Sequence, residues 1–307
     1  MKKKVNILLS TYNGEKYIEQ QLNSLLAQTY ENIDIYIRDD NSKDHTIGII
    51  ERIIKENKTE KQIYILDNHH QNLGYPDCFW ELLDKCQEAD YYSFCDQDDY
   101  WEPEKIEKAV GMLESLHTPG LFFHAYEICD EKLNCNYVYT YPKKTIEVND
   151  MLFWVFAQGF SFVLNKELKE LVQKTMPKGK QLPHDIWCLW VAYINGQIVF
   201  TDEVLAKYRR YEGAVTTTHG SLFTKVKGAF ANELFGNRLR EFQYRFDLLL
   251  DLYGTNMKTE TKNALTIYST RNHGFLAYIK KVFYGKRIMP SVMGEIVFRI
   301  AFLFGKI

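Results

Sequence analysis

The sequence predicts an α/β fold in which a mostly parallel sheet is flanked by helices and followed by a helical C-terminal region. Two observations lead to this prediction. Short apolar segments typical of buried strands alternate with segments whose apolar residues recur at helical spacing, and the connections between them are short. After about Gly220 only helical spacing remains. With 307 residues, 46% of them hydrophobic, the chain can bury the core that this fold requires.

Strand and helix alternate from the start of the chain. The segment 5–9 is apolar apart from Asn6, as expected of a strand covered on both faces, and 17–27 has helical spacing. Further strands are predicted at 33–37, 63–66, 91–95 and 121–126, and helices at 46–55, 79–86, 103–116 and 185–194. Such alternation is typical of parallel strands with helices on both faces.

Composition and cysteine pattern exclude some classes of protein. The net charge of −2 gives no indication of a nucleic-acid partner. The cysteines form no C-x-x-C pair and no zinc-like spacing with histidine, so we expect all six to be reduced. The apolar run at 5–9 is too short for a signal peptide or a membrane span, which predicts a cytoplasmic protein.

Three aspartates, Asp96, Asp98 and Asp99, follow the strand predicted at 91–95. In an extended chain alternate side chains point the same way, so Asp96 and Asp98 can face one ligand. Carboxylates this close repel each other, and a hard cation such as Mg²⁺ or Mn²⁺ would relieve the repulsion and bridge to a diphosphate. The alternative is an acidic turn exposed to solvent, which is common.

Several motifs, taken together and in this order, resemble those of the family 2 glycosyltransferases, which have the GT-A type of nucleotide-sugar fold. They are Leu9-Ser10-Thr11-Tyr12-Asn13-Gly14, Gln28-Thr29-Tyr30, Arg38-Asp39-Asp40-Asn41-Ser42-Lys43-Asp44, Asn72-Leu73-Gly74, Cys95-Asp96-Gln97-Asp98-Asp99-Tyr100-Trp101 and His184-Asp185-Ile186-Trp187. The resemblance covers about 5–210. It implies a catalytic domain at 1–220, followed by a helical region at 221–307.

The resemblance also implies where the nucleotide sugar binds. Ser10, Tyr12 and Asp40 are expected to hold the nucleotide, and we count Asp96 and Gln97 with them as contacts of the nucleotide sugar. An aspartate after a strand suits this role, because its carboxylate accepts hydrogen bonds from a base N–H or a ribose hydroxyl. From the residues alone, Asp39-Asp40-Asn41-Ser42 could be only a turn with a helix cap.

For catalysis, the resemblance implies an inverting, metal-dependent sugar transfer. Asp98 and Asp96 would hold Mn²⁺ or Mg²⁺, and Asp185 would be the base that takes the proton from the attacking hydroxyl. From the residues alone, Asp185 could equally cap the helix that follows it. Relatives carry a histidine in the motif that reads Tyr208-Arg209-Arg210-Tyr211 here, so no metal contact is carried over to that position.

The run at 95–101 looks most like that of bacterial rhamnosyltransferases of polysaccharide synthesis. The donor is therefore expected to be dTDP-rhamnose or a UDP-hexose, and the acceptor a hydroxyl of a cell-surface polysaccharide or lipid-linked oligosaccharide. Two alternatives are a sugar nucleotidyltransferase and a non-catalytic assembly partner. A nucleotidyltransferase would usually have a glycine-rich basic loop after the first strand, and this chain has none there. A non-catalytic partner is disfavoured because all the acidic residues are present.

The C-terminal segment 288–304 is apolar but interrupted by Pro290, Glu295 and Arg299, and basic residues precede it. It is a poor candidate for a bilayer span. The pattern fits a helix that lies at the inner face of the plasma membrane as a peripheral contact. It fits equally a helix that packs on the catalytic domain or on another subunit of a homo-oligomer.

Overall fold

The computed structural model describes residues 2–176, 182–211 and 238–303. The chain divides into two units, Met1–Pro142 with Ala157–Ala214, and Lys143–Phe156 with Val215–Ile307. The boundary expected at 220 lies outside the described residues. The segment Lys143–Phe156, which we expected in the first region, belongs to the second unit.

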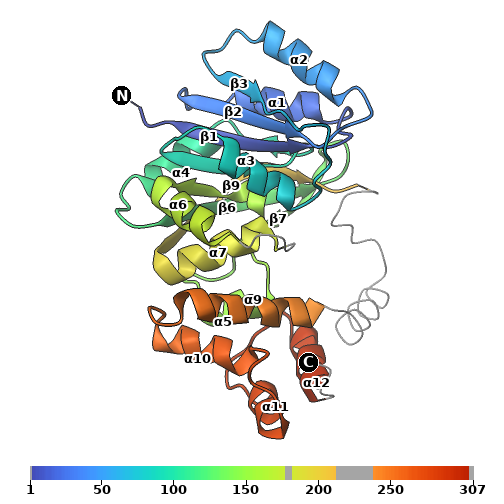
Figure 1. The fold of residues 1–307 in the computed structure, drawn as a ribbon. Coiled ribbons are helices and arrows are strands. Elements are labelled where there is room, and N and C mark those ends of the chain that lie inside the picture. The colour runs from blue at the N-terminus through green and yellow to red at the C-terminus, as the bar shows by residue number, and fades with distance from the viewer. Residues whose placement is uncertain (1, 177–181, 212–237, 304–307) are drawn as a thin grey trace. The chain divides into compact units, whose positions relative to one another are not determined.

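Within the described residues, the first unit contains one nine-stranded sheet with strand order β3-β2-β1-β4-β8-β6-β9-β5, in which β7 pairs with β6 (Figure 1). The strands are β1 Val5–Thr11, β2 Ile33–Asp39, β3 Gln62–Ile65, β4 Tyr91–Cys95, β5 Tyr100–Trp101, β6 Gly120–Cys129, β7 Cys135–Tyr139, β8 Val163–Asn165 and β9 Gln197–Arg209. The pairs β1–β2, β1–β4, β2–β3 and β6–β9 are parallel. Because β8 is antiparallel to both β4 and β6, β6 and β9 run in the direction of β1. The predicted mostly parallel sheet is confirmed.

Five helices of the first unit lie where the apolar spacing predicted them, and a further one, α6, was not predicted. These helices are α1 Ile18–Leu26, α2 Thr46–Glu56, α3 Asp77–Lys85, α4 Lys105–Leu113, α6 Lys166–Thr175 and α7 His184–Asn195, with a short 3₁₀ helix at Gly159–Ser161. Ile7 packs in one buried cluster with residues of α1, α2 and α4. Leu8, whose side chain points to the opposite face of the sheet, is also fully buried. Both faces of β1 are therefore covered, which explains its nearly continuous apolar sequence.

Parallel register places the carboxyl ends of three strands side by side. Leu9 pairs with Cys95 of β4, and Thr11 pairs with Asp39 of β2. The segments that follow these strands, 12–14, 40–42 and 96–99, therefore start at the same edge of the sheet. This is the edge at which parallel α/β sheets bind ligands.

The second unit is helical, as predicted for the C-terminal region. Its helices are α5 Val148–Phe153, α9 Arg238–Tyr253, α10 Thr259–Tyr268, α11 Phe275–Val282 and α12 Val292–Leu303. The ring of Phe153 lies 5.0 to 5.9 Å, centroid to centroid, from five aromatic rings of this unit: Phe242, Phe246, Tyr268, Phe298 and Phe302. The short helix α5 thus supplies the centre of an aromatic core to which α9, α10 and α12 all contribute.

The apolar segment predicted at 288–304 divides into two faces. Phe298 and Phe302 are buried in the core of the second unit, whereas Val292, Met293 and Ile296 are exposed. The second half of α12 therefore packs on α5 of its own unit, which is neither the catalytic domain nor another subunit. Among the described residues, no helix combines the length and the apolar content needed to cross a bilayer.

The expectation that all six cysteines are reduced is wrong. Cys129 and Cys135 form a disulfide, because the hairpin of β6 and β7 pairs them directly and brings their Cα atoms to 3.9 Å. The other four cysteines, Cys78, Cys86, Cys95 and Cys188, are free thiols and buried.

We expect Phe153→Ala to lower the free energy of unfolding of the helical unit by about 3–5 kcal/mol, because the vacated space is surrounded by rings that cannot all close in. Guanidinium unfolding followed by circular dichroism measures the change. Phe275→Ala is the matched control, since that side chain is 77% exposed, and it should cost about 0.5 kcal/mol or less. Equal losses in the two variants would contradict the central position of Phe153.

Candidate active site

The loops after β1 and β4 are fastened together by Gln97. The backbone N–H of Tyr12 donates to Gln97 Oε1 at 2.8 Å, and Gln97 Nε2 donates to the Tyr12 carbonyl at 3.0 Å. Gly14 is needed beside this pair, because a Cβ there would lie 2.2 Å from Gln97 Oε1. The sequence did not indicate this structural role for Gln97, and its contact with a nucleotide sugar stays a prediction.

The loop after β2 is held by Asp39. Its Oδ1 accepts a hydrogen bond from Thr11 Oγ1 at 2.9 Å, and its Oδ2 accepts one from the Ser42 backbone N–H at 2.8 Å. Ser42 Oγ in turn accepts from the Asn13 backbone N–H. Asp39 therefore has the turn-forming role that we considered for this motif, and it joins the β1 and β2 loops.

Asp40 points to a different set of partners. Its carboxylate accepts hydrogen bonds from the backbone N–H groups of Leu73 and Gly74, at 2.8 and 2.7 Å, and forms an ion pair with Arg38. Burial opposes the charge of Arg38, but hydrogen bonds to Glu81 and Asp40 raise the pKa of the guanidinium overall. Asp40 thus fixes the segment before α3 at the sheet edge, and its contact with a nucleotide stays a prediction.

Ser10 and Tyr12, the other residues predicted to hold the nucleotide, lie at the end of β1. The Ser10 hydroxyl is a hydrogen-bond partner of the buried Cys78 thiol, whose pKa is raised by burial to about 11. The ring of Tyr12 is 48% exposed. An exposed aromatic ring at a ligand-binding edge can stack on a planar group such as a base.

The three aspartates after β4 separate into two environments. Asp96 and Asp98 are half-buried, whereas Asp99 is fully buried. Burial, followed by the charges of Asp98 and Asp185, raises the pKa of Asp96 to about 7. Burial also raises the pKa of Asp98, while a hydrogen bond from Tyr211 acts in the opposite direction.

Asp99 faces the interior. Its Oδ1 accepts a hydrogen bond from the Arg209 backbone N–H at 3.2 Å, and its Oδ2 has no partner in the described part of the chain. Burial, followed by the charges of Asp98 and Asp96, raises the pKa of Asp99 well above its usual range, and the nearby Lys105 acts in the opposite direction. Asp99 is therefore not a candidate for direct contact with a ligand.

Asp96 and Asp98 fit a divalent cation. They are partly exposed oxygen donors; burial raises the pKa of both, and the charge of Asp98 raises that of Asp96 further. In the described ranges, three ligand atoms lie within 4.8 Å of one another only at Glu127, Cys129 and Cys135, two of which form the disulfide. Mg²⁺ commonly takes one or two carboxylates and completes its shell with water and substrate phosphates, which matches an open pair of aspartates.

Arg209 and Tyr211, at the end of β9, hold the aspartate loop from the other side. Arg209 Nε donates to the Asp98 carbonyl at 2.7 Å, and the guanidinium lies 4.5 Å from the centre of the Tyr17 ring. The Tyr211 hydroxyl donates to Asp98 Oδ2 at 2.8 Å. Arg209 is 4% exposed and is therefore part of the packed structure of this edge.

Asp185 is in the first turn of α7, and its charge raises the pKa of Asp96. The N-cap position of this helix is occupied by Pro183, but Asp185 Oδ1 accepts a hydrogen bond from the Ile186 backbone N–H at 2.7 Å. The start of a helix favours a negative charge. The structure thus brings the predicted base and the predicted metal ligands to one region.

His184, which precedes Asp185, is buried among aromatic rings, including those of Phe79 and Phe94. Burial lowers the pKa of its imidazole to about 3, so the ring is neutral. A Cβ on Gly159 would lie 2.5 Å from His184 Nε2, which shows how closely the backbone packs on the ring. In the structure His184 therefore supports the start of α7 by packing.

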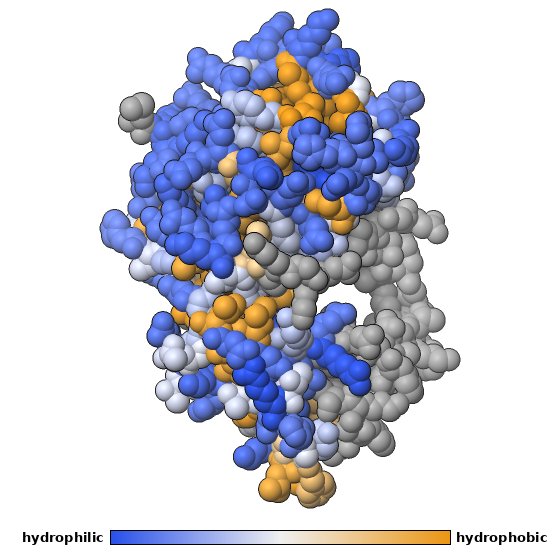
Figure 2. Space-filling view, viewed as in Figure 1, coloured by the Kyte–Doolittle hydropathy of each residue, from blue (hydrophilic) through white to orange (hydrophobic). Residues whose placement is uncertain are grey.

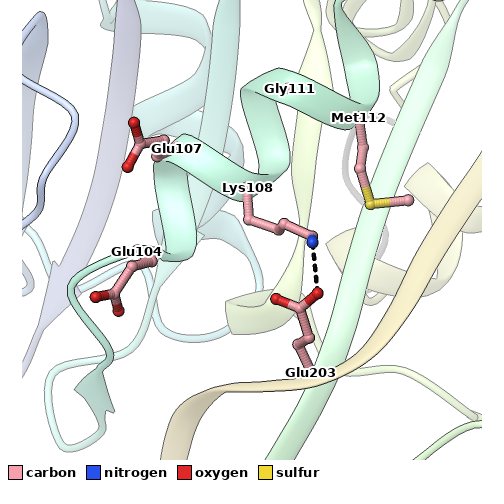
Figure 3. A pocket seen from close by; sticks show the side chains of 6 residues that line it. All are labelled: Glu104, Glu107, Lys108, Gly111, Met112 and Glu203. Atoms are coloured by element: carbon pink, nitrogen blue, oxygen red, sulfur yellow. Dashed lines mark hydrogen bonds and ion pairs between the residues drawn. The ribbon is translucent and has the colours of Figure 1, made fainter.

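A surface pocket lies elsewhere on the first unit, along α4 (Figure 3). It is lined by Glu104, Glu107, Lys108, Gly111, Met112 and Glu203, and an ion pair joins Lys108 to Glu203. None of the predicted site residues lines it. We therefore place the candidate active site at the sheet edge and not in this pocket.

Two known proteins are similar to this chain over most of its length. The chain is 26% identical to the uncharacterized glycosyltransferase RP339 of Rickettsia prowazekii over 282 residues, which cover 90% of the chain and 78% of the relative. It is 27% identical to the dTDP-rhamnosyl transferase RfbG of Shigella flexneri over 299 residues, which cover 85% of the chain and 96% of the relative.

Solved structures show the same fold at low sequence identity. S. aureus TarS 1-349 in complex with UDP-GlcNAc matches 98% of this chain and 90% of its own, with a TM-score of 0.58 and 16% identity. The mannosyltransferase PcManGT of Pyrobaculum calidifontis, in complex with GDP-Man and Mn²⁺, matches 100% of this chain and 86% of its own, with a TM-score of 0.55 and 12% identity. The model of "Glycosyl transferase family 2" matches residues 6–172, more than half of the chain. The protein therefore belongs to glycosyl transferase family 2.

Proposed function

We propose that the protein transfers a sugar from a nucleotide diphosphate sugar to an acceptor hydroxyl, with inversion at the anomeric carbon. One observation carries this proposal: α7 begins beside the end of β4, where the His184 ring lies 4.5 Å from that of Phe94, and the neighbouring Asp185 is close enough to the aspartate loop for its charge to raise the pKa of Asp96. A predicted base and a predicted diphosphate site thus lie in one region, as a single displacement requires.

In the proposed reaction, Asp185 accepts the proton of the acceptor hydroxyl. The hydroxyl oxygen then forms a bond to the anomeric carbon, and the bond from that carbon to the nucleotide diphosphate breaks, so that its electron pair leaves with the diphosphate. The Ile186 N–H fixes the orientation of one Asp185 oxygen. A single carboxylate suffices for this step, because no covalent enzyme intermediate is formed.

The donor site consists of residues from three loops at the sheet edge. We propose that Ser10, Tyr12 and Asp40 bind the nucleotide, and that Asp98 and Asp96 hold Mn²⁺ or Mg²⁺. When bound, the cation would stabilise the negative charge that develops on the departing nucleotide diphosphate. Gln97 keeps the β1 and β4 loops together through its two hydrogen bonds to Tyr12, so that the donor meets a preformed edge.

The donor is a dTDP-rhamnose or a UDP-hexose in this proposal, and the acceptor belongs to a growing cell-surface polysaccharide or a lipid-linked oligosaccharide. The similarity to the dTDP-rhamnosyl transferase RfbG along 85% of the chain supports the first donor. The family match gives no support to a nucleotidyltransferase.

Binding of the donor tests the proposal directly, because a ligand that binds the folded protein raises its thermal stability. We expect one of dTDP-rhamnose, UDP-glucose, UDP-N-acetylglucosamine and GDP-mannose to raise the unfolding temperature in the presence of Mn²⁺ or Mg²⁺, and less with a chelator. Asp98→Ala should abolish the dependence on the cation. Glu104→Ala, in the pocket along α4, is the control and should behave as the unchanged protein. The metal site would be contradicted if the donor raised the unfolding temperature equally with and without the cation, and equally in Asp98→Ala.

Asp185→Asn should bind the donor normally, while the rate of sugar transfer falls by about 10²-fold or more, as expected when a general base is lost. Calorimetry measures the binding, and release of the nucleotide diphosphate measures the transfer. Asp202→Asn replaces an exposed carboxylate on β9 and should leave both unchanged. A near-normal transfer rate in Asp185→Asn would reduce Asp185 to a structural residue of α7.

Tyr211→Phe should move the acid limit of cation-dependent donor binding to higher pH. The Tyr211 hydroxyl lowers the pKa of Asp98 through its hydrogen bond, so its removal raises that pKa, and the carboxylate that the cation needs then forms only at higher pH. Binding measured over a series of pH values checks this shift. Tyr137→Phe, at an exposed ring of β7, is the control. An unchanged pH profile for Tyr211→Phe would show that Asp98 does not limit binding.

A further inference from the structure

The helical unit exposes a continuous set of apolar side chains on α11 and the first half of α12, which we call the apolar ridge. It consists of Phe275, Leu276, Ile279, Phe283, Val292, Met293 and Ile296. Phe275 and Phe283 are 77% and 75% exposed. The two helices pack against each other, and Figure 2 shows hydrophobic surface where α11 lies in Figure 1. Exposed apolar groups that gather in this way usually mark an interaction surface.

The ridge does not have the polar composition expected of the solvent-facing side of an amphipathic helix. In α11 the side facing the unit is formed by Ala277, Lys281 and Val282, all buried, while the exposed side carries Phe275, Leu276 and Ile279, and the exposed Phe283 follows directly after the helix. A surface helix normally presents polar residues to water. Here the solvent side of α11 is more apolar than its buried side, so an apolar environment outside the protein would stabilise it.

The charge around the ridge is positive. Between residues 272 and 303 there are five Lys or Arg residues and one acidic residue, Glu295, which gives a net charge of +4 in a chain whose total is −2. Of these cations, Lys281 is buried, and Lys286 and Arg299 form ion pairs with Glu260 and Glu295. Lys280 and Arg287 are exposed beside the ridge with no ion pair among the described residues, and they supply its positive charge. Apolar side chains bordered by basic ones are complementary to a surface with an apolar interior and a negative boundary.

We propose that the apolar ridge docks the protein on a membrane that contains anionic lipid, with Phe275 and Phe283 inserted at the boundary between headgroups and acyl chains. Two copies of the ridge would bring like charges together, which disfavours a second copy of this chain as the occupant. The docking segment differs from the one predicted at 288–304, because it begins on α11 and excludes the buried second half of α12. The proposal rests on the second unit and is independent of the chemistry at Asp185.

The test is flotation of the full-length protein with vesicles of phosphatidylcholine, with and without phosphatidylglycerol. We expect binding to the anionic vesicles, weaker binding to the neutral ones, and a decrease when salt is added. Phe275→Ala with Phe283→Ala should lower binding by about tenfold or more. Lys280→Glu with Arg287→Glu should lower it on the anionic vesicles alone. Tyr137→Ala with Val138→Ala, at exposed apolar residues of β7, is the matched control and should bind as the unchanged protein.

Equal binding by the protein with and without the two phenylalanines would overturn the proposal, provided that circular dichroism shows both to be folded. Equal binding to neutral and anionic vesicles would overturn the role of charge. A dimer in analytical ultracentrifugation that Phe275→Ala with Phe283→Ala dissolves would assign the ridge to a second copy instead. Asp185→Asn should bind vesicles like the unchanged protein, so a failure of the proposed catalysis and a failure of docking are distinguishable.

Discussion

The parallel pairing of β1 with β2 and β4 is the constraint on which the candidate active site depends. Parallel strands leave the sheet at the same edge, and the register aligns Leu9 with Cys95 and Thr11 with Asp39. The loops that follow therefore meet without any long connection. Because both faces of these strands are covered by helices, the edge is the place where polar side chains of the three loops can gather.

Charges at that edge are partly or fully buried, and hydrogen bonds offset the cost of their burial. Asp40 is surrounded by Arg38 and two backbone N–H groups, and Asp99 and Asp98 are tied to Arg209. These contacts order the loops before any ligand arrives. On the partly exposed Asp96, burial and the charges of Asp98 and Asp185 all raise the pKa, and a bound cation would act against them.

The two units have separate physical roles. The sheet unit supplies the polar edge, whereas the helical unit combines an aromatic core around Phe153 with an exposed apolar ridge on α11 and α12. The core and the ridge are made of the same residue types. What distinguishes them is packing: rings from α9, α10 and α12 surround Phe153 of α5, whereas the side chains of the ridge are exposed.

The sequence by itself determined the alternation of strands and helices, the sheet edge that carries polar loops, and the identity of the family. The spacing of hydrophobic residues and the short motifs are local properties, so they can be recognised from the order of residues alone. Only the tertiary structure decided that Gln97 fastens Tyr12, that Tyr211 holds Asp98, and that Cys129 bonds to Cys135. The first two contacts join residues 85 and 113 positions apart. Such contacts, and the choice between a buried and an exposed apolar face, depend on how the elements pack, which no local pattern encodes.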